Sequence, residues 1–144
     1  MKLAVIGSRT FEDRERLYEI LDKNLHNIEM IVSGGANGAD SLAQEWAQER
    51  GVPYLIFPAR WYDLNGVYDK GAGFRRNRKI IDACDKVLAF HDGVSKGTLH
   101  SLGMAKEKNK PVKIILFVPV PKNKPVKKTP PTPSIINMEK DVPF

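Results

Sequence analysis

The sequence predicts an α/β fold in which a parallel five-stranded sheet carries helices on both faces. Short apolar runs alternate with stretches whose apolar residues recur at helical spacing, and this alternation is typical of a parallel sheet. The runs are continuously apolar, as expected of strands that are covered on both faces. Right-handed crossovers favour the strand order 3-2-1-4-5, in which the topological switch point lies between the first and fourth strands.

The predicted strands are apolar runs that end in glycine, proline or polar residues. They span residues 3–6, 30–33, 54–57, 86–90 and 112–118. A helix is expected after each of the first four strands, except that the third is followed first by an irregular loop over residues 59–70. Thr10 is the expected N-cap of the first helix, and Gly51 is the expected stop of the second.

Composition excludes several classes of protein. One cysteine, Cys84, rules out an internal disulfide framework and any multi-cysteine zinc site. No apolar run approaches the ~20 residues that span a bilayer, and the chain begins with a core-strand pattern rather than a signal peptide. We therefore expect a cytoplasmic protein without a membrane segment, with Cys84 as a buried small apolar residue.

The positive charge is concentrated at the C-terminal end. From Pro119 onward, the sequence contains five lysines and only two acidic residues, Glu139 and Asp141, so this segment supplies half of the net charge of +6. The same segment contains seven prolines and is predicted to be an extended tail. We divide the chain into a domain over residues 1–118 and a Pro/Lys-rich tail over residues 119–144. The domain is only mildly basic, which makes nucleic acid an unlikely partner.

The stretch Ile31–Asp40 is the strongest functional signal. An apolar run ends at Ser33, glycines follow at 34, 35 and 38, and a helical pattern begins at once. Glycines let the backbone approach an anion closely, and the free amides of a helix start favour negative charge. The alternative is a turn that needs small residues for packing alone.

Several familiar motifs are absent from the sequence. The glycine stretch lacks the Lys-Ser/Thr ending of a P-loop and the spacing of a dinucleotide fingerprint. There is no zinc-protease or serine-hydrolase motif, and the three scattered histidines do not suggest a metal site. We expect neither a metal nor a cofactor.

Four segments occur together in a recognisable order. They are Val5–Arg9, Ser33–Asp40, Ala72–Asn77 and Asp92–His100. Together they resemble the YspA/cpYpsA-related family of the SLOG superfamily, which also contains the LOG phosphoribohydrolases and the DprA/Smf DNA-processing proteins. The resemblance covers residues 1–118 and implies a Rossmann-like three-layer sandwich that binds nucleotides or their derivatives. Many members occur in phages and mobile elements, and likeness to LOG proteins implies a homodimer or higher homo-oligomer.

The LOG comparison fails at one position. LOG enzymes cleave the N-glycosidic bond of nucleoside monophosphates with a glutamate three residues after a Gly-Thr pair, and an upstream arginine assists. Here Gly97-Thr98 matches that pair and Arg76 matches the arginine, but Ser101 stands where the glutamate would be. Serine cannot stabilise an oxocarbenium-like centre or activate water as a carboxylate does. LOG-type hydrolysis is therefore doubtful.

Individual residues retain two interpretations each. Asp40 either complements the helix dipole or contacts a ribose hydroxyl or acts as a base, and Thr98 is either a cap or a phosphate ligand. Trp61 and Tyr62 are candidates for stacking on a base. The predicted ligand-binding set is Gly7, Ser8, Arg9, Ser33, Gly34, Gly35, Asn37, Gly38, Asp40, Arg76, Asn77, Gly97 and Thr98. The candidate catalytic residues are Asp40, Asp92 and His100, without a decision that the protein is an enzyme.

Three functions follow from the sequence. The first is a sensor or sequestering protein that binds a nucleotide or nucleotide-derived small molecule through phosphate at the strand ends. The second is a hydrolase or transferase acting on a nucleotide or an NAD/ADP-ribose-type ligand. The third is a binder of single-stranded DNA like DprA.

Overall fold

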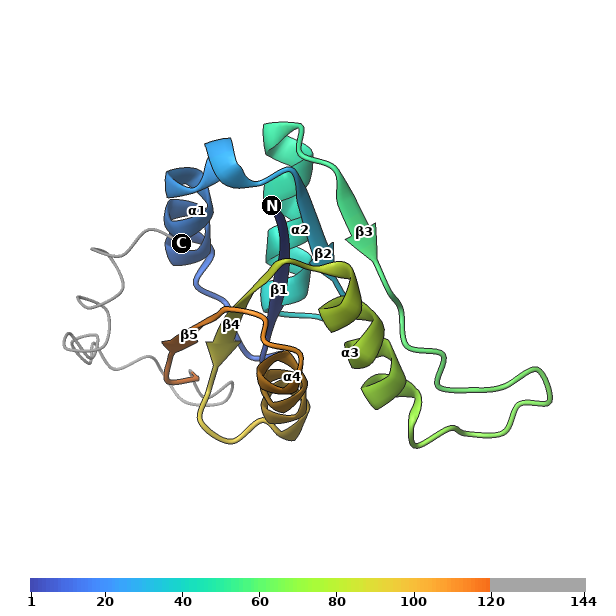
Figure 1. The fold of residues 1–144 in the computed structure, drawn as a ribbon. Coiled ribbons are helices and arrows are strands. Elements are labelled where there is room, and N and C mark those ends of the chain that lie inside the picture. Colours follow the sequence, from blue (N-terminus) through green and yellow to red (C-terminus); the bar gives the residue numbers. More distant parts are fainter. Residues whose placement is uncertain (120–144) are drawn as a thin grey trace.

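The computed structural model, which describes residues 1–119, contains one parallel sheet in the order β3-β2-β1-β4-β5 (Figure 1). This confirms the predicted α/β class and strand order. The strands are β1 (Lys2–Gly7), β2 (Met30–Ser33), β3 (Tyr54–Ile56), β4 (Lys86–His91) and β5 (Val112–Leu116). The predicted tail lies almost wholly outside the described residues.

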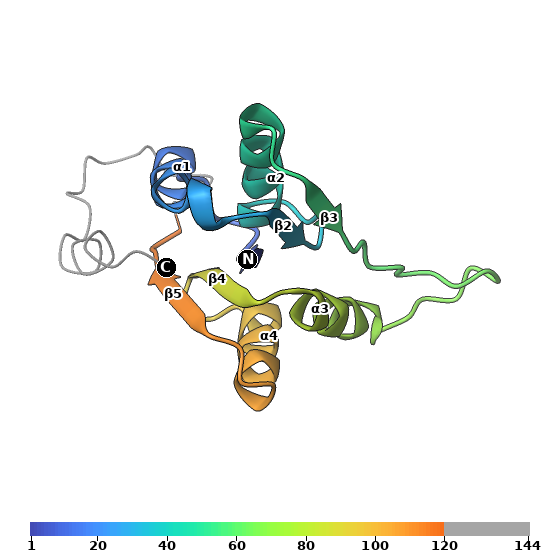
Figure 2. The ribbon, with the colours of Figure 1, turned by 45° about the horizontal axis from the view of Figure 1, so that its top comes forward.

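Four helices and one 3₁₀ turn connect the strands. They are α1 (Arg14–Lys23), η1 (Leu25–Asn27), α2 (Ala39–Arg50), α3 (Ala72–Ala83) and α4 (Lys96–Glu107). Figure 2 shows α1 and α2 on one side of the sheet and α3 and α4 on the other, which makes three layers. Within residues 1–119, none of these helices is long and apolar enough to cross a bilayer.

The sheet separates two hydrophobic cores. Leu3 and Val5 of β1 face the core beneath α1 and α2, whereas Ala4 and Ile6 face the core beneath α3 and α4. Because successive side chains of a strand point to opposite faces, a strand buried on both sides must be apolar at every position. This accounts for the continuous apolar runs from which the sheet was predicted. Cys84 is buried in the second core, as expected.

The start of α1 differs from the prediction. Asp13, not Thr10, caps the helix, because its carboxylate accepts a hydrogen bond from the amide of Arg16 at 3.1 Å. The helix also ends at Lys23, and the chain continues in the 3₁₀ turn. Thr10 is left in the loop that follows β1.

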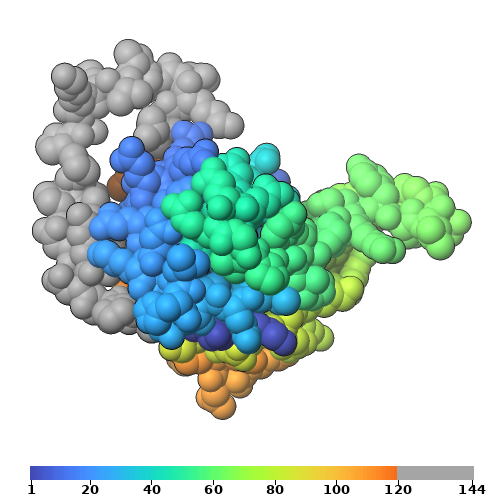
Figure 3. Space-filling model, turned by 90° about the horizontal axis from the view of Figure 1, so that it is seen from above, coloured from blue at the N-terminus to red at the C-terminus, as the bar shows by residue number. Residues whose placement is uncertain are grey.

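Residues 58–71 form an arm that extends away from the body of the molecule (Figure 3). As predicted, the arm contains no regular element, although Tyr62 and Tyr68 form one isolated antiparallel bridge. Trp61 stacks on Tyr68 with ring centroids 6.1 Å apart and planes inclined by 10°. Leu64 at the far end is fully exposed. The arm therefore holds Trp61 near the domain and carries apolar side chains outward.

Replacing Trp46 tests the first core. Trp46 is fully buried, and its Nε1 donates a hydrogen bond to Asp22 on α1 at 2.8 Å. We expect Trp46→Ala to lower the free energy of unfolding by roughly 3–5 kcal/mol, because it leaves a large cavity in the core. Urea unfolding followed by circular dichroism measures the loss. Trp61→Ala, at the partly buried tryptophan of the arm, is the control and should cost far less. Equal losses would contradict this assignment of the core.

Candidate functional site

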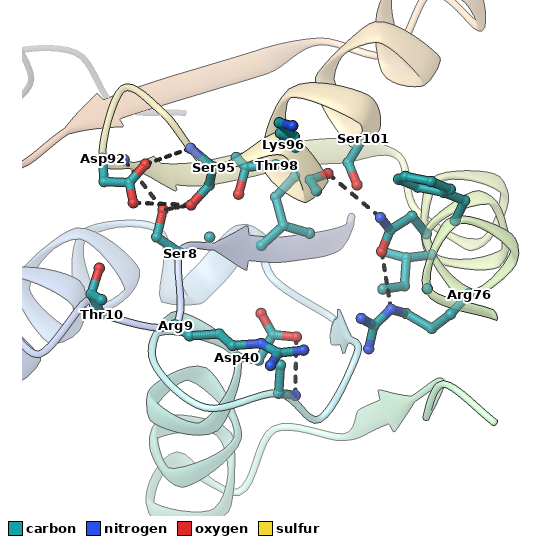
Figure 4. Close-up of a pocket in the computed structure, with 18 of the residues that line it drawn as sticks. Ser8, Arg9, Thr10, Asp40, Arg76, Asp92, Ser95, Lys96, Thr98 and Ser101 are labelled. Atoms are coloured by element: carbon teal, nitrogen blue, oxygen red, sulfur yellow. Dashed lines mark hydrogen bonds between the residues drawn. The ribbon is translucent and has the colours of Figure 1, made fainter. Parts of the chain in front are cut away.

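A cavity of about 370 Å³ lies beyond the carboxyl ends of β1 and β4, where the strand order reverses. The loops after these strands and the first turns of α3 and α4 form its walls (Figure 4). Ligands of open α/β sheets bind in such a crevice. Of the predicted ligand-binding residues, Gly7, Ser8, Arg9, Asp40, Arg76, Asn77, Gly97 and Thr98 line it.

A second cavity of about 260 Å³ adjoins the glycine loop, residues 34–38. Its lining includes Gly34, Gly35 and Asn37 from this loop, together with Pro58 and Ala59. Four residues line both cavities, and they are Arg9, Ala36, Trp61 and Arg76. Ser33 and Gly38, also predicted as ligand-binding residues, line neither.

Two glycines of the loop have close neighbours where a side chain would stand. Gly38 has a φ of +83°, and a Cβ there would overlap the carbonyl oxygen of Ser8. A Cβ on Gly34 would overlap the guanidinium of Arg76. These two glycines therefore let the loop approach the residue after β1 and the side chain of Arg76. From the sequence, the close neighbour was expected to be a phosphate.

The carboxylate of Asp40 is buried at the start of α2 and holds the glycine loop. Its Oδ2 accepts hydrogen bonds from the amides of Gly34 at 2.9 Å and Ala36 at 3.4 Å. Burial raises the pKa of Asp40 to about 6, outweighing these hydrogen bonds and the positive charges of Arg76 and Arg9, which lower it. The amide of Gly34, a residue that the sequence places in the ligand-binding set, thus donates to Asp40.

Arg76 links the glycine loop to the far side of the cavity. Its NH1 donates to the carbonyl of Gly34 at 2.8 Å, and its Nε donates to Oδ1 of Asn77 at 3.0 Å. The amide of Asn77 in turn approaches the carbonyl of Gly97 at 3.5 Å. Burial lowers the pKa of Arg76, but guanidinium groups remain protonated in proteins. A positive charge is therefore fixed at the wall shared by both cavities.

Further positive charge converges on the larger cavity. The side chain of Arg9 extends past Asp40 toward Arg76 (Figure 4). Lys70 and Lys96 also line the cavity, and the side chains of Arg9, Lys70 and Lys96 form no hydrogen bond or ion pair within residues 1–119. No side chain caps α4 in the part of the chain described, so the amides of its first turn that precede the one of Leu99, which donates to the carbonyl of Ser95, have no side-chain acceptor. The cavity is therefore suited to an anion.

Asp92 organises the loop between β4 and α4. Its Oδ1 accepts from the amides of Val94 and Ser95 at 2.9 and 2.8 Å, and its Oδ2 accepts from the hydroxyl of Ser95 at 3.0 Å. Burial favours a higher pKa for Asp92, but these hydrogen bonds and one from Ser8 hold it below the ordinary value. The hydroxyl groups of Ser8 and Ser95 also form a hydrogen bond, with their oxygens 2.8 Å apart. Asp92 is therefore an internal acceptor of the loop.

The remaining candidates divide between the cavity and its surroundings. Thr98 is buried and lines the larger cavity, as does Ser101. His100 lines neither cavity, and its ring contacts Phe74 with centroids 4.2 Å apart. Within residues 1–119, no three His, Cys, Asp or Glu side chains are grouped as a metal site would require.

Sequence reasoning omitted Ser95, Lys96 and Lys70 from the site. The spacing of Asp92 and Ser95 before a helix is a signal for a side-chain-stabilised turn, and it could have identified Ser95. Lys96 directly precedes the predicted Gly97-Thr98 pair. Lys70 had no signal, because its position depends on the path of the arm.

Comparison with known proteins identifies the family. A model of the YspA, cpYpsA-related SLOG family matches residues 1–63. Gene 61 protein of Mycobacterium phage D29 is 34% identical in an alignment of 120 positions that covers 77% of this chain and 93% of the phage protein. The chain belongs to this SLOG family. The resemblance inferred from the four sequence segments is therefore confirmed.

Solved structures of low sequence identity share the fold. DNA processing protein A from Helicobacter pylori, described by its single-stranded DNA binding mode, has a TM-score of 0.66 and 24% identity over 86% of this chain and 67% of its own. The Streptococcus pneumoniae protein has a TM-score of 0.66 and 21% identity, and 85% of this SLOG chain spans about half (52%) of it. The molybdenum cofactor binding protein of Rippkaea orientalis has a TM-score of 0.57 and 19% identity over 80% of this chain and 76% of its own.

The raised pKa of Asp40 predicts a pH dependence of stability. The folded protein holds this proton more tightly than the unfolded chain, so the free energy of unfolding should decrease as pH rises from about 4 through about 6, and then level off. The full contribution is about 3 kcal/mol. Asp40→Asn should remove it, leaving a flatter profile in urea unfolding measured between pH 4 and 8. Parallel profiles of wild type and variant would contradict a raised pKa.

Proposed function

We propose that this protein binds a nucleotide or nucleotide-derived small molecule and acts as a sensor or sequestering protein. One observation carries the proposal. Arg9, Arg76, Lys96 and the uncapped start of α4 all line the larger cavity, while both of its carboxylates accept hydrogen bonds from the protein's own loops. Such a site offers hydrogen-bond donors to an anion, whereas each of its carboxylates already accepts hydrogen bonds from backbone amides of the protein.

A phosphate group fits this chemistry. The first amides of a helix and its dipole favour an anion, and a guanidinium donates two parallel hydrogen bonds to phosphate oxygens. The cavity volume of about 370 Å³ falls within the range of roughly 300–1,000 Å³ for small-molecule sites. The indole of Trp61 at the cavity edge offers a flat surface for a base.

The likeness to other SLOG structures supports ligand binding at this fold in general terms. One neighbour is described as a molybdenum cofactor binding protein, and another by its mode of binding single-stranded DNA. A small molecule is the better proposal here, because the hydrogen-bond donors line one cavity at the strand ends.

Titration with nucleotides tests the proposal. Nucleoside mono-, di- and triphosphates of each base, with an oligothymidylate for comparison, are titrated by isothermal calorimetry. Arg76→Ala should lower the affinity for the nucleotide roughly tenfold to a hundredfold, because a hydrogen bond to a charged group contributes ~1.5–3 kcal/mol. Lys96→Ala, which removes no internal hydrogen bond, should also weaken it.

Arg78→Ala provides the matched control. Arg78 is exposed on the same helix and lines neither cavity, so its loss changes the net charge equally and should leave the affinity unchanged. Equal effects of Arg76→Ala and Arg78→Ala would contradict a defined phosphate site. Binding of the oligothymidylate alone, falling steeply with salt, would favour the DNA-binding alternative.

Catalysis is the second candidate, and the pKa of Asp40 favours it. A carboxyl group with a pKa of about 6 in a ligand cavity lies in the range useful for a general acid or base. Its two hydrogen bonds from the glycine loop argue for a structural role instead.

Product analysis separates binding from turnover. We expect no product when the protein is incubated with nucleoside monophosphates, NAD or ADP-ribose and the mixture is analysed by chromatography. Ser101 offers no carboxylate, and the pKa of Asp92 is lowered by its loop bonds. Product formation that Asp40→Asn abolishes would overturn the binding-only proposal.

A further inference from the structure

Strand β5 forms one edge of the sheet, and within residues 1–119 no further strand pairs with it (Figure 1). The carbonyl of Pro111 and the amide of Phe117 bond to β4. Because the backbone groups of successive residues in a strand alternate between its two edges, those of Ile114 and Leu116 point away from β4. β5 therefore presents hydrogen-bonding groups to which another strand can be added.

The same edge carries an apolar stripe, which we define as Ile114, Leu116 and Val118. Ile115 faces the core beneath α1 and α2, so its two neighbours face the side of the sheet on which α3 and α4 lie (Figure 2). Val112 at the start of β5 packs against the second core there, but the three residues of the stripe are 45%, 43% and 69% exposed. Proteins commonly cover apolar strand edges, because open ones promote aggregation. We therefore expect a partner strand at this edge.

The chain beyond β5 contains a segment suited to that role. Prolines recur through residues 119–133, and proline cannot donate a backbone hydrogen bond to a neighbouring strand. Residues 134–142, which lie outside the described residues, read Ser-Ile-Ile-Asn-Met-Glu-Lys-Asp-Val. This is the longest stretch without a proline in residues 119–144, and isoleucine and valine favour strands. The 134–142 segment is therefore the part of the tail that can pair along its whole length.

The apolar residues of the 134–142 segment match the stripe in spacing. Ile136 and Met138 are two positions apart, as Ile114 and Leu116 are, so an extended segment directs both to one face. Side chains that face each other across neighbouring strands contact one another and remove apolar surface from water. Pairing of the segment with β5 in this orientation would therefore cover the stripe.

The acidic residues of the segment match the opposite face. Glu139 and Asp141 alternate with the apolar pair, so an extended segment directs them away from the stripe. On β5, Lys113 alternates with the stripe and faces the side of α1, from which Arg16 donates to the carbonyl of Leu116 at 3.5 Å. Acidic and basic side chains thus share one face whenever the apolar side chains share the other. A slip by one residue would lose both matches.

The connection between β5 and the segment is long enough and keeps the segment close to the edge. Residues 119–133 would span up to ~46 Å as an extended polyproline helix, whereas a strand of five residues is ~17 Å long. A segment tethered in this way has an effective concentration in the millimolar range, which exceeds that of a second copy of the chain in a dilute solution. The tail of the same chain is therefore favoured over a second copy.

We propose that residues 134–142 add to the open edge of β5 in their own chain, with Ile136 and Met138 against the stripe. The sheet then has a sixth strand, and β5 is no longer its edge. Residues 112–118 line neither cavity, so this inference is independent of the proposed function.

Amide hydrogen exchange of the full chain, measured by NMR, tests the proposal. The amides of Ile114 and Leu116 face the edge and should be protected by the added strand, whereas the amide of Ile115 faces β4 and serves as the internal reference. Ile136→Asp places a charge against the stripe, so exchange at the two edge amides should become roughly tenfold faster, a difference of ~1.4 kcal/mol. Exchange at Ile115 should not change, which shows that the sheet is intact.

Val126→Asp is the matched control, because it makes the same change of charge in the tail outside the 134–142 segment. It should leave exchange at Ile114 and Leu116 unchanged. Fast exchange of both amides in the wild type, no effect of Ile136→Asp, or an equal loss of protection in the two variants overturns the proposal. Protection that survives Ile136→Asp and increases with protein concentration would assign the edge to a second copy and overturn it as well.

Discussion

The buried carboxylate of Asp40 is the group on which the arrangement of the site depends. By accepting the amides of Gly34 and Ala36, it fixes the loop whose carbonyl at Gly34 then orients Arg76. Arg76 continues the network through Asn77 toward the start of α4. A charged group is costly to bury, and this cost is visible as the raised pKa of Asp40. The protein thus stabilises an irregular loop with a carboxylate, Asp40, whose ionised form is disfavoured by its burial.

The sheet was predictable because its cause is local and repeated. A strand buried on both faces must be apolar throughout, and handedness then leaves few topologies. The position of Gly7, Arg9 and Thr98 at the cavity follows from the same rule, since strand ends meet at one edge of a parallel sheet. Side-chain direction was not predictable in this way. Whether Thr10 or Asp13 caps α1 depends on where the chain turns after β1, which the sequence pattern does not specify.

The acids of the cavity illustrate a wider difficulty in assigning function from residue type. Both Asp40 and Asp92 lie where a catalytic carboxylate would be expected, yet each accepts backbone amides of its own loop. The sequence contains the residue type but not its hydrogen-bond partners, so the two roles look alike until the loops are placed. Ser101 was informative for the opposite reason, because a missing carboxylate is evident from the sequence alone.

The contacts that build the site join segments distant in the chain. Ser8 meets Ser95 across 87 residues, and Arg76 meets Gly34 across 42. No single βα unit supplies all of the cavity walls, so the site exists only when the loops after β1, β2 and β4 have been brought together by the folded sheet. Any ligand of this site therefore binds the folded chain and not the unfolded one, and adds its binding free energy to the stability of the entire domain. A compound that binds this site should therefore raise the melting temperature of the protein, so a thermal-shift measurement can identify the ligand.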